Sequence, residues 1–374
     1  MQFRDLKKQY QVLQKEMDLA IFDAVASGTF IMGPQVKELE TQLAKYVGVK
    51  HCLTCANGTD ALTLALKAWG VGPGDAVFVP DFTFFASAEV VSLEGATPVF
   101  VDVQKDTFNL DAEDLERAVK EVLSEGQLRP CVVVAVDLFG LPADYKPIRE
   151  VANKYGLLVL EDGAQGFGGS IGEKRACSFG DIATTSFFPA KPVGCYGDGG
   201  AVFTSNDEWA ALIDSFRVHG KGTFKYDNIR IGMNSRLDTV QAAVLQVKLK
   251  AFADYELDDV NKVAERYTEL LQGLATPVIP EGFRSSWAQY TLRFANRAQR
   301  DSVQAALKAQ GIPSMVYYPK PMHLQTAFSV IPGVPRNLPV ATSLCDRVLS
   351  LPMHPYLTIE DIETVCTAVL KALQ

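Results

Sequence analysis

The densest group of residues that could do chemistry is a lysine in a loop rich in proline and glycine. Lys191 lies close to Pro189 and Pro192, and glycines follow at positions 194, 197, 199 and 200. Prolines fix the backbone around the lysine, and glycines allow tight turns and close approach of other groups. Such a loop can aim the amine into a crowded pocket, where it could add to a carbonyl group. A lone lysine in such a loop is more often simply solvated, so the neighbouring segments must decide.

A carboxylate follows the apolar segment Leu157–Leu160. Asp162 comes at the end of this predicted strand, within the sequence Glu-Asp-Gly-Ala-Gln that ends at Gln165. A carboxylate at the C-terminal end of a parallel strand faces the crevice where α/β proteins bind ligands. An aspartate in this position can equally cap the next helix. Both interpretations of Asp162 remain open on this pattern alone.

A polar turn precedes the apolar helix predicted to begin near Asp60. Asn57, Gly58 and Thr59 form this turn, and the free N–H groups of a helix N-terminus can bind a phosphate. Ser186, shortly before the lysine, could add a hydroxyl to the same phosphate. The turn is also a common helix cap, which needs no ligand.

Aromatic residues follow another predicted strand, Ala76–Pro80. The run Phe82–Phe85 contains three phenylalanines, which could stack on a planar ring or pack in the core. Together, the amine, the carboxylate, the phosphate site and the aromatic rings suit one ligand, pyridoxal phosphate (PLP). Asp162 would keep its pyridine nitrogen protonated, so that the ring acts as an electron sink. Gln165 would hydrogen-bond its phenolic oxygen.

Alternating strand and helix patterns separate these features. Short apolar segments predict the strands Ala76–Pro80, Pro98–Asp102, Cys131–Asp137, Leu157–Asp162, Ile182–Phe187 and Gly200–Thr204. Helical patterns lie between them, so we expect a mostly parallel sheet in an α/β domain. A long helical pattern from about residue 238 to 274 leads into a smaller α+β part. We predict a large PLP-binding domain over residues 1–250 and a small C-terminal domain over residues 251–374.

Composition and charge narrow the class of protein. The 374 residues carry a net charge of −8, which argues against nucleic acid or an anionic membrane as the partner. The chain begins without an apolar signal segment, and its seven cysteines are scattered and odd in number. These features predict a cytoplasmic protein with reduced thiols, and Cys52 and Cys55 are expected to be buried small residues. The four histidines are dispersed, so we expect no metal site.

Three longer motifs carry a resemblance to a known family. They are S-F-F-P-A-K-P-V-G-C-Y-G-D-G-G-A (186–201), E-D-G-A-Q (161–165) and G-M-N-S-R-L-D-T-V-Q-A-A (232–243). The chain resembles the DegT/DnrJ/EryC1/StrS nucleotide-sugar aminotransferases over nearly its whole length. The resemblance implies the aspartate-aminotransferase fold (PLP fold type I) and a homodimer with shared active sites. It also implies transfer of an amino group, with pyridoxamine phosphate as the intermediate form of the cofactor, to a keto sugar on a nucleotide.

The resemblance also implies roles for single residues. Lys191 would form the Schiff base and move protons, and Asp162 would pair with the pyridine nitrogen. Asn234 would reach the phosphate from the partner subunit. The cofactor-binding set is Gly58, Thr59, Asp60, Phe84, Asp162, Gln165, Ser186, Lys191 and Asn234. The substrate-binding set is Arg236, Tyr317, Tyr318 and His323.

Within the family, the sequence is most similar to UDP-2-acetamido-2-deoxy-3-oxo-glucuronate aminotransferases. This likeness implies amination at C3 with L-glutamate as donor, for amino sugars of surface polysaccharides such as the lipopolysaccharide O-antigen. Tyr317 stands where those enzymes have a histidine, and a tyrosine cannot carry a positive charge for a sugar carboxylate. Alternatives are a 4-keto-sugar aminotransferase, a PLP-dependent sugar dehydratase or lyase, and a non-catalytic regulator. Related dehydratases replace the lysine with histidine, whereas Lys191 is present.

Overall fold

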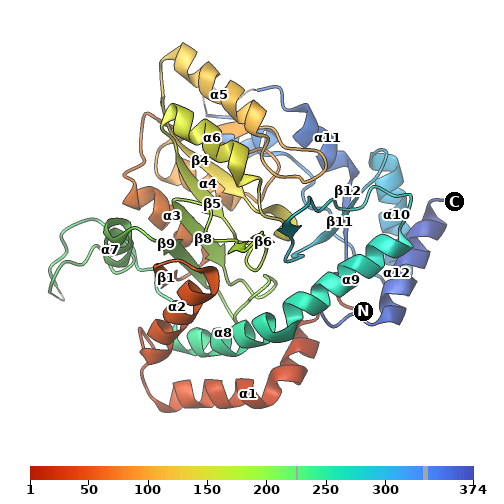
Figure 1. Ribbon diagram of the computed structural model, residues 1–374, viewed down its shortest axis with the longest axis horizontal. Coiled ribbons are helices and arrows are strands. Elements are labelled where there is room, and N and C mark those ends of the chain that lie inside the picture. Colours follow the sequence, from red (N-terminus) through yellow and green to blue (C-terminus); the bar gives the residue numbers. More distant parts are fainter. Residues whose placement is uncertain (225, 332–335) are drawn as a thin grey trace.

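The computed structural model describes residues 1–224, 226–331 and 336–374. A large lobe is built around a sheet with helices on both faces, and α9 (Leu257–Leu270), α10 (Arg297–Ala309) and α12 (Ile359–Ala372) gather in a second lobe (Figure 1). α1 (Leu6–Ala26) lies along the outside of the molecule and packs on α8 (Thr239–Ala251). No helix in the described ranges is long and apolar enough to cross a membrane.

The large sheet has seven strands in the order β1-β9-β8-β5-β4-β2-β3. Neighbouring strands from β8 to β3 are parallel, and β9 pairs antiparallel with both β8 and β1. The mostly parallel sheet is therefore confirmed. The strands are β1 (His51–Cys55), β2 (Asp75–Pro80), β3 (Thr97–Val101), β4 (Arg129–Val136), β5 (Leu158–Asp162), β8 (Ile182–Ser186) and β9 (Gly200–Thr204).

Alternate residues of the strands enter different cores, which shows that both faces of the sheet are covered. Val132 and Val134 belong to one hydrophobic cluster, whereas Val133 and Ala135 belong to another. Strands buried on both faces read as continuous apolar runs, which is why six strands were predictable. β1 was not predicted because its sequence His-Cys-Leu-Thr-Cys mixes polar and apolar residues, and its antiparallel pairing with β9 defines it.

Helices fill both outer layers. One hydrophobic cluster contains residues of α3, α4 and α7, and the cluster on the other face of the sheet contains residues of α5 and α6. A third cluster includes α2, which packs beside α8. Asp111 caps α5, as a capping aspartate should, by accepting hydrogen bonds from two backbone N–H groups of its first turn. These helices are α2 (Pro34–Val47), α3 (Gly58–Ala68), α4 (Ala86–Leu93), α5 (Ala112–Glu125), α6 (Tyr145–Tyr155) and α7 (Asp207–Phe216).

The second lobe follows a long helical stretch. α8 continues through a π-helical turn, Phe252–Glu256, into α9 (Leu257–Leu270). The proposed domain boundary at residues 250 and 251 falls inside this stretch, and the division stays a prediction. The C-terminal helices and strands are β11 (Tyr290–Arg293), α10 (Arg297–Ala309), α11 (Pro339–Arg347), β12 (Val348–Leu351) and α12 (Ile359–Ala372). A separate small sheet contains β6 (Ser170–Ile171), β7 (Lys174–Arg175) and β10 (Phe283–Arg284).

Candidate active site

The predicted chemical residues meet at one edge of the large sheet. β2, β5 and β8 are oriented alike, so their carboxyl ends lie at the same edge. Asp162 ends β5, Ser186 ends β8, and the phenylalanine run follows β2. In α/β sheets this edge is the usual place for a ligand.

Lys191 lies in the turn after β8 and is half-buried. Its backbone N–H donates to the carbonyl of Phe188 at 2.8 Å. A side chain at Gly194 would place its Cβ only 2.4 Å from the carbonyl oxygen of Pro189, so only glycine fits this tight turn. Burial lowers the pKa of the Lys191 amine, and the charge of Asp162 opposes this effect. The interpretation of Lys191 as a freely solvated lysine is therefore excluded.

Asp162 is a buried carboxylate with two hydrogen-bond donors. Ser87 Oγ donates to Oδ2 at 2.7 Å, and the backbone N–H of Ala164 donates to Oδ1 at 3.2 Å. The residues that follow form turns rather than a helix, so Asp162 is not a helix cap. Burial raises the pKa of Asp162, against the lowering effect of Ser87, Ala164 and Lys191. Within the described ranges no cation lies at ion-pair distance, so the carboxylate suits a ligand that brings its own positive charge.

The N-terminus of α3 provides the expected anion site. Asn57 caps the helix, and its Oδ1 accepts the N–H of Asp60 at 2.8 Å. The N–H groups of Gly58 and Thr59 have no acceptor among the described residues. A Cβ at Gly58 would lie 2.7 Å from Ser186 Cβ, so this helix end sits directly against Ser186. The cap and the phosphate site therefore coexist, since the cap uses one N–H group and leaves two for a ligand.

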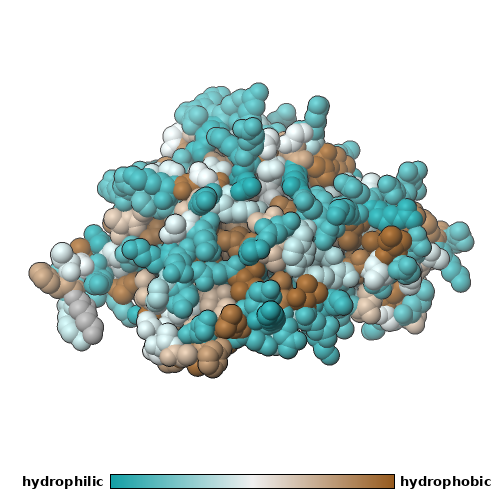
Figure 2. All heavy atoms as spheres, turned by 60° about the horizontal axis from the view of Figure 1, so that its bottom comes forward, coloured by the Kyte–Doolittle hydropathy of each residue, from teal (hydrophilic) through white to brown (hydrophobic). Residues whose placement is uncertain are grey.

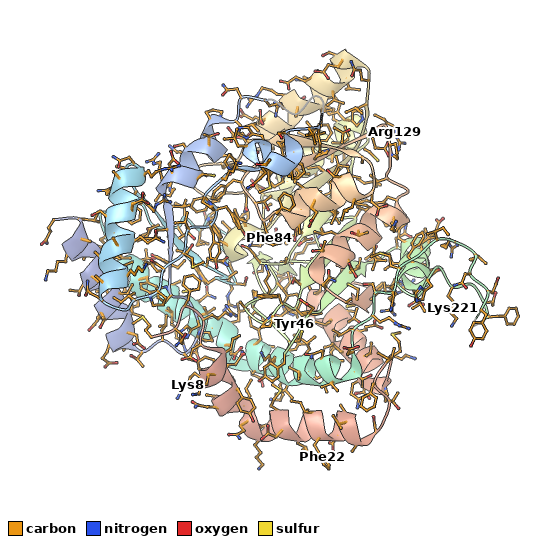
Figure 3. All side chains as sticks on the ribbon, turned by 180° about the vertical axis from the view of Figure 1, so that it is seen from behind. Lys8, Phe22, Tyr46, Phe84, Arg129 and Lys221 are labelled. Atoms are coloured by element: carbon orange, nitrogen blue, oxygen red, sulfur yellow. The ribbon has the colours of Figure 1, made fainter. Side chains whose placement is uncertain are left out.

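Only one ring of the phenylalanine run is free to stack. Phe82 is buried and Phe85 is partly buried, whereas Phe84 is 54% exposed. Phe84 lies near the middle of the molecule in Figure 3, and its ring centroid is 6.3 Å from that of Tyr318. The Tyr318 hydroxyl accepts a hydrogen bond from Gln165 Nε2 at 3.0 Å. Gln165, Phe84 and Tyr318 therefore line one side of the site.

The residues predicted for the substrate side are distributed around this wall. Tyr317 is half-buried beside Tyr318. His323 is held by Asp81, whose Oδ2 lies 2.6 Å from its Nδ1 and whose Oδ1 accepts its backbone N–H at 2.7 Å. Asn234 is exposed, and its Oδ1 accepts a hydrogen bond from Arg236 at 2.7 Å.

The Asn234–Arg236 segment borders the anion site rather than standing apart from it. Between these two residues, the Ser235 hydroxyl accepts the N–H of Ala56 at 3.1 Å, next to the turn that opens α3. Two residues that act on predicted site groups were missed: Ser87, which binds Asp162, and Asp81, which binds His323. Asp81 directly follows β2, which is its only sequence signal, and Ser87 lies in the first turn of α4.

The site fits PLP. A buried carboxylate without a cation, a lysine with a lowered pKa, two free N–H groups at a helix end and an exposed ring are the groups that this cofactor needs. Fold and site therefore define a PLP-dependent enzyme of fold type I.

Comparison with known proteins gives the particular family. The chain belongs to the DegT/DnrJ/EryC1/StrS aminotransferase family, whose model matches residues 11–370. It is 46% identical to the UDP-2-acetamido-2-deoxy-3-oxo-D-glucuronate aminotransferase of Pseudomonas aeruginosa, over 98% of this chain and 99% of that protein. It is 40% identical to the UDP-N-acetyl-3-dehydro-alpha-D-glucosamine 3-aminotransferase of Acidithiobacillus ferrooxidans, over 99% and 97% of the two chains.

A solved structure shows the same similarity. The crystal structure of a DegT/DnrJ/EryC1/StrS aminotransferase from Brucella abortus aligns with a TM-score of 0.96 and 49% identity, over 99% of both chains. The predicted fold class and enzyme class are thus confirmed, and PLP is the cofactor. The roles of the single residues stay predictions.

A buried pair of carboxyl groups lies beneath the site. Glu161 precedes Asp162, and its carboxylate accepts the backbone N–H groups of Cys177, Phe179 and Gly180. Asp137 accepts two donors on Oδ1, whereas Oδ2 has no donor in the described structure. Burial, followed by the charge of Glu161, raises the pKa of Asp137 well above its usual value. A carboxyl group with a raised pKa keeps its proton to higher pH, and in that form the Oδ2 of Asp137 is a donor that can face Glu161.

We expect Asp137→Asn to be tolerated, because an amide keeps the Oδ1 acceptor and supplies an N–H in place of the acid proton. Because the pKa of Asp137 is raised in the folded state, the free energy of unfolding falls as pH rises above the pKa that Asp137 has in the unfolded chain. In the asparagine variant the free energy of unfolding should no longer fall with pH. At pH 8 it should exceed that of wild type by about 1 kcal/mol or more. Asp137→Ala should lose about 2 kcal/mol because it leaves buried donors unpaired. Urea unfolding between pH 5 and 8 checks both, and equal destabilisation of the two variants would refute the shared proton.

Proposed function

We propose that the protein transfers the amino group of L-glutamate to carbon 3 of a UDP- or dTDP-linked keto sugar. The observation that supports this most is the meeting of Lys191, Asp162 and the N-terminus of α3 at one edge of the sheet. The two relatives described above are named for 3-oxo or 3-dehydro sugars linked to UDP. The product would be an amino sugar for surface polysaccharides such as the lipopolysaccharide O-antigen, made in the cytoplasm.

Each residue of the site has a defined task in this proposal. When bound, PLP supplies an electron sink that makes removal of a proton next to the amino group feasible. Burial lowers the pKa of Lys191, and the neutral form of its amine takes the proton from the α-carbon of glutamate. In the second half of the reaction it delivers a proton to the sugar carbon that receives the amino group. 2-Oxoglutarate leaves after the first half and the amino sugar after the second.

The other side chains hold the reactants. The buried Asp162 carboxylate binds the protonated ring nitrogen, and Ser87 keeps that carboxylate in place. Gly58 and Thr59 offer their N–H groups to the phosphate, with Asp60 in the same helical turn and the Ser186 hydroxyl opposite. The exposed Phe84 would stack on the ring, and Gln165 would hydrogen-bond its phenolic oxygen. Tyr317, Tyr318 and His323 line the sugar side, with Arg236 near the phosphate groups.

The proposal includes a homodimer in which Asn234 reaches the phosphate of the partner subunit's site. Asn234 is exposed in the single chain, so its side chain is accessible to a second subunit. Phe22 points away from α1 at the edge of the molecule (Figure 3), and the face that contains α1 shows apolar patches among hydrophilic ones (Figure 2). Large apolar side chains are exposed on α1 and in the loop after it: Val12, Leu19, Phe22, Val25, Phe30, Ile31 and Met32. Apolar exposure of this extent is typical of a subunit interface.

A panel of keto sugars tests the substrate. The pyridoxamine phosphate form of the protein should react with nucleotide-linked 3-keto sugars at least about tenfold faster than with 4-keto sugars, measured by recovery of the aldehyde absorbance. Tyr317→His should shift preference towards sugars with a C6 carboxylate, because a histidine can carry positive charge. Faster reaction with 4-keto sugars would contradict amination at C3.

A further inference from the structure

The turn that carries Lys191 is held on its two sides by different parts of the chain. On the sheet side, Lys191 N–H donates to Phe188 O and Cys195 N–H donates to Phe187 O, both at 2.8 Å. On the other side, the guanidinium Nη2 of Arg4 donates to the carbonyl oxygen of Lys191 at 2.9 Å and to that of Pro192 at 3.4 Å. A residue near the start of the chain therefore fixes the outer side of the turn.

The positive charge of Arg4 is available to act on the lysine. Among the described residues, no carboxylate lies within ion-pair distance of Arg4. Glu256 raises the pKa of Arg4, although burial lowers it more. That carboxylate is already bound by Gln9 Nε2 at 2.9 Å and by the hydroxyl of Tyr356. Burial lowers the pKa values of Lys248 and His354, and the charge of Arg4 lowers both further.

The residue before Arg4 connects to the opposite wall of the site. The carbonyl oxygen of Phe3 accepts the N–H of Met353 at 3.1 Å. The Phe3 ring meets the Tyr317 ring edge-on, with 6.1 Å between centroids and an interplanar angle of 70°. Two consecutive residues thus touch the lysine turn and the predicted sugar side. α1 begins directly after them, with Asp5 as its cap.

We propose that Arg4 is a positioning residue for Lys191, and that Phe3 and Arg4 together fix the lysine relative to Tyr317. The proposal rests on the function given above, in which Lys191 is the base. Holding the backbone carbonyl fixes where the Lys191 amine can reach, and small displacements of a reacting group are costly. Burial is the main cause that lowers the pKa of Lys191; Asp162 opposes it, and the charge of Arg4 adds to the lowering.

Three variants separate geometry from charge. Arg4→Met removes both the donors and the charge, whereas Arg4→Lys keeps the charge but cannot bind two carbonyl groups in the same way. Lys8→Gln is the control, because Lys8 is exposed at the start of α1 (Figure 3) and only its backbone N–H makes a described contact. Two experiments are done. The first measures kcat and KM for the full reaction. The second measures how acetylation of Lys191 by acetic anhydride depends on pH in the cofactor-free full chain.

For Arg4→Met we expect kcat to fall by about 10-fold to 100-fold with KM within about twofold. Lys191 should then be acetylated only at higher pH, since a neighbouring positive charge is lost. Arg4→Lys should show an intermediate kcat and near wild-type acetylation, and Lys8→Gln should match wild type in both. An unchanged kcat in Arg4→Met overturns the inference. A fall in kcat that is fully explained by a smaller folded fraction, measured by circular dichroism, also overturns it. Should Arg4→Met not fold, a wild-type kcat in Arg4→Lys overturns it.

The same assay separates this inference from the function on which it rests. If the wild-type protein does not turn over glutamate and a nucleotide-linked keto sugar, the proposed function is wrong. If wild type is active and Arg4→Met is equally active, only the role of Arg4 is wrong.

Discussion

Lys191→Ala should lower turnover by about 1000-fold or more, because it removes the amine that moves the proton in both halves of the reaction. The lysine sits in a turn that proline and glycine shape, and its pKa is lowered mainly by burial. A neutral amine is the form that can accept a proton. Steady-state kinetics of amino transfer from glutamate measure the effect directly.

Lys248→Met is the matched control for this change. Lys248 is also buried, burial lowers its pKa to about 8, and its amine lies 4.5 Å from the centre of the Tyr196 ring. It lies on α8 and makes no contact with Asp162. Turnover of the folded control should remain near that of wild type. A Lys191→Ala variant that keeps more than about a tenth of wild-type turnover would remove Lys191 from the chemistry.

Asp162→Asn should lower kcat by about 100-fold or more while the protein still folds, because the amide keeps the shape but loses the charge that faces the ring nitrogen. Ser87→Ala should lower kcat less, by about tenfold, because it removes only one hydrogen bond to the Asp162 carboxylate. The ratio of these two losses separates the charge itself from its positioning. Equal kcat in Asp162→Asn and wild type would refute the pairing.

The pH profile gives a second readout for the same carboxylate. Burial raises the pKa of Asp162, and the Ser87 hydrogen bond lowers it. Activity that needs the ionised carboxylate is lost as pH falls through this pKa. Ser87→Ala removes a lowering contribution, so the acid limb of kcat should move to higher pH. An acid limb that stays in place would show that another group controls it.

Much of the sheet could be predicted because its strands are buried on both faces. Continuous apolar runs such as Cys131–Asp137 identify β4, whose observed bounds are Arg129–Val136. The polar edge strand β1 could not be found in this way, because its partner β9 lies about 150 residues later. The pattern of a single strand carries no information about such pairings.

The site was predictable only where residues follow strands directly. Asp162 and Ser186 end strands, so the edge of the sheet brings them together. The pattern of residues did not distinguish the three phenylalanines after β2. The family resemblance pointed to Phe84, and packing shows that Phe84 is the exposed one. Partners distant in the sequence were not visible either: Ser87 is 75 residues from Asp162, and Asp81 is 242 residues from His323.

Transfer of isotope from glutamate to the sugar shows whether the protein aminates carbon 3. The purified protein is given [15N]L-glutamate and a UDP-linked 3-keto sugar, and the sugar product is examined by mass spectrometry and NMR. We expect one labelled nitrogen bound to carbon 3 of each product molecule and one 2-oxoglutarate released for each. A sugar product without labelled nitrogen, or with the label at another carbon, would contradict it.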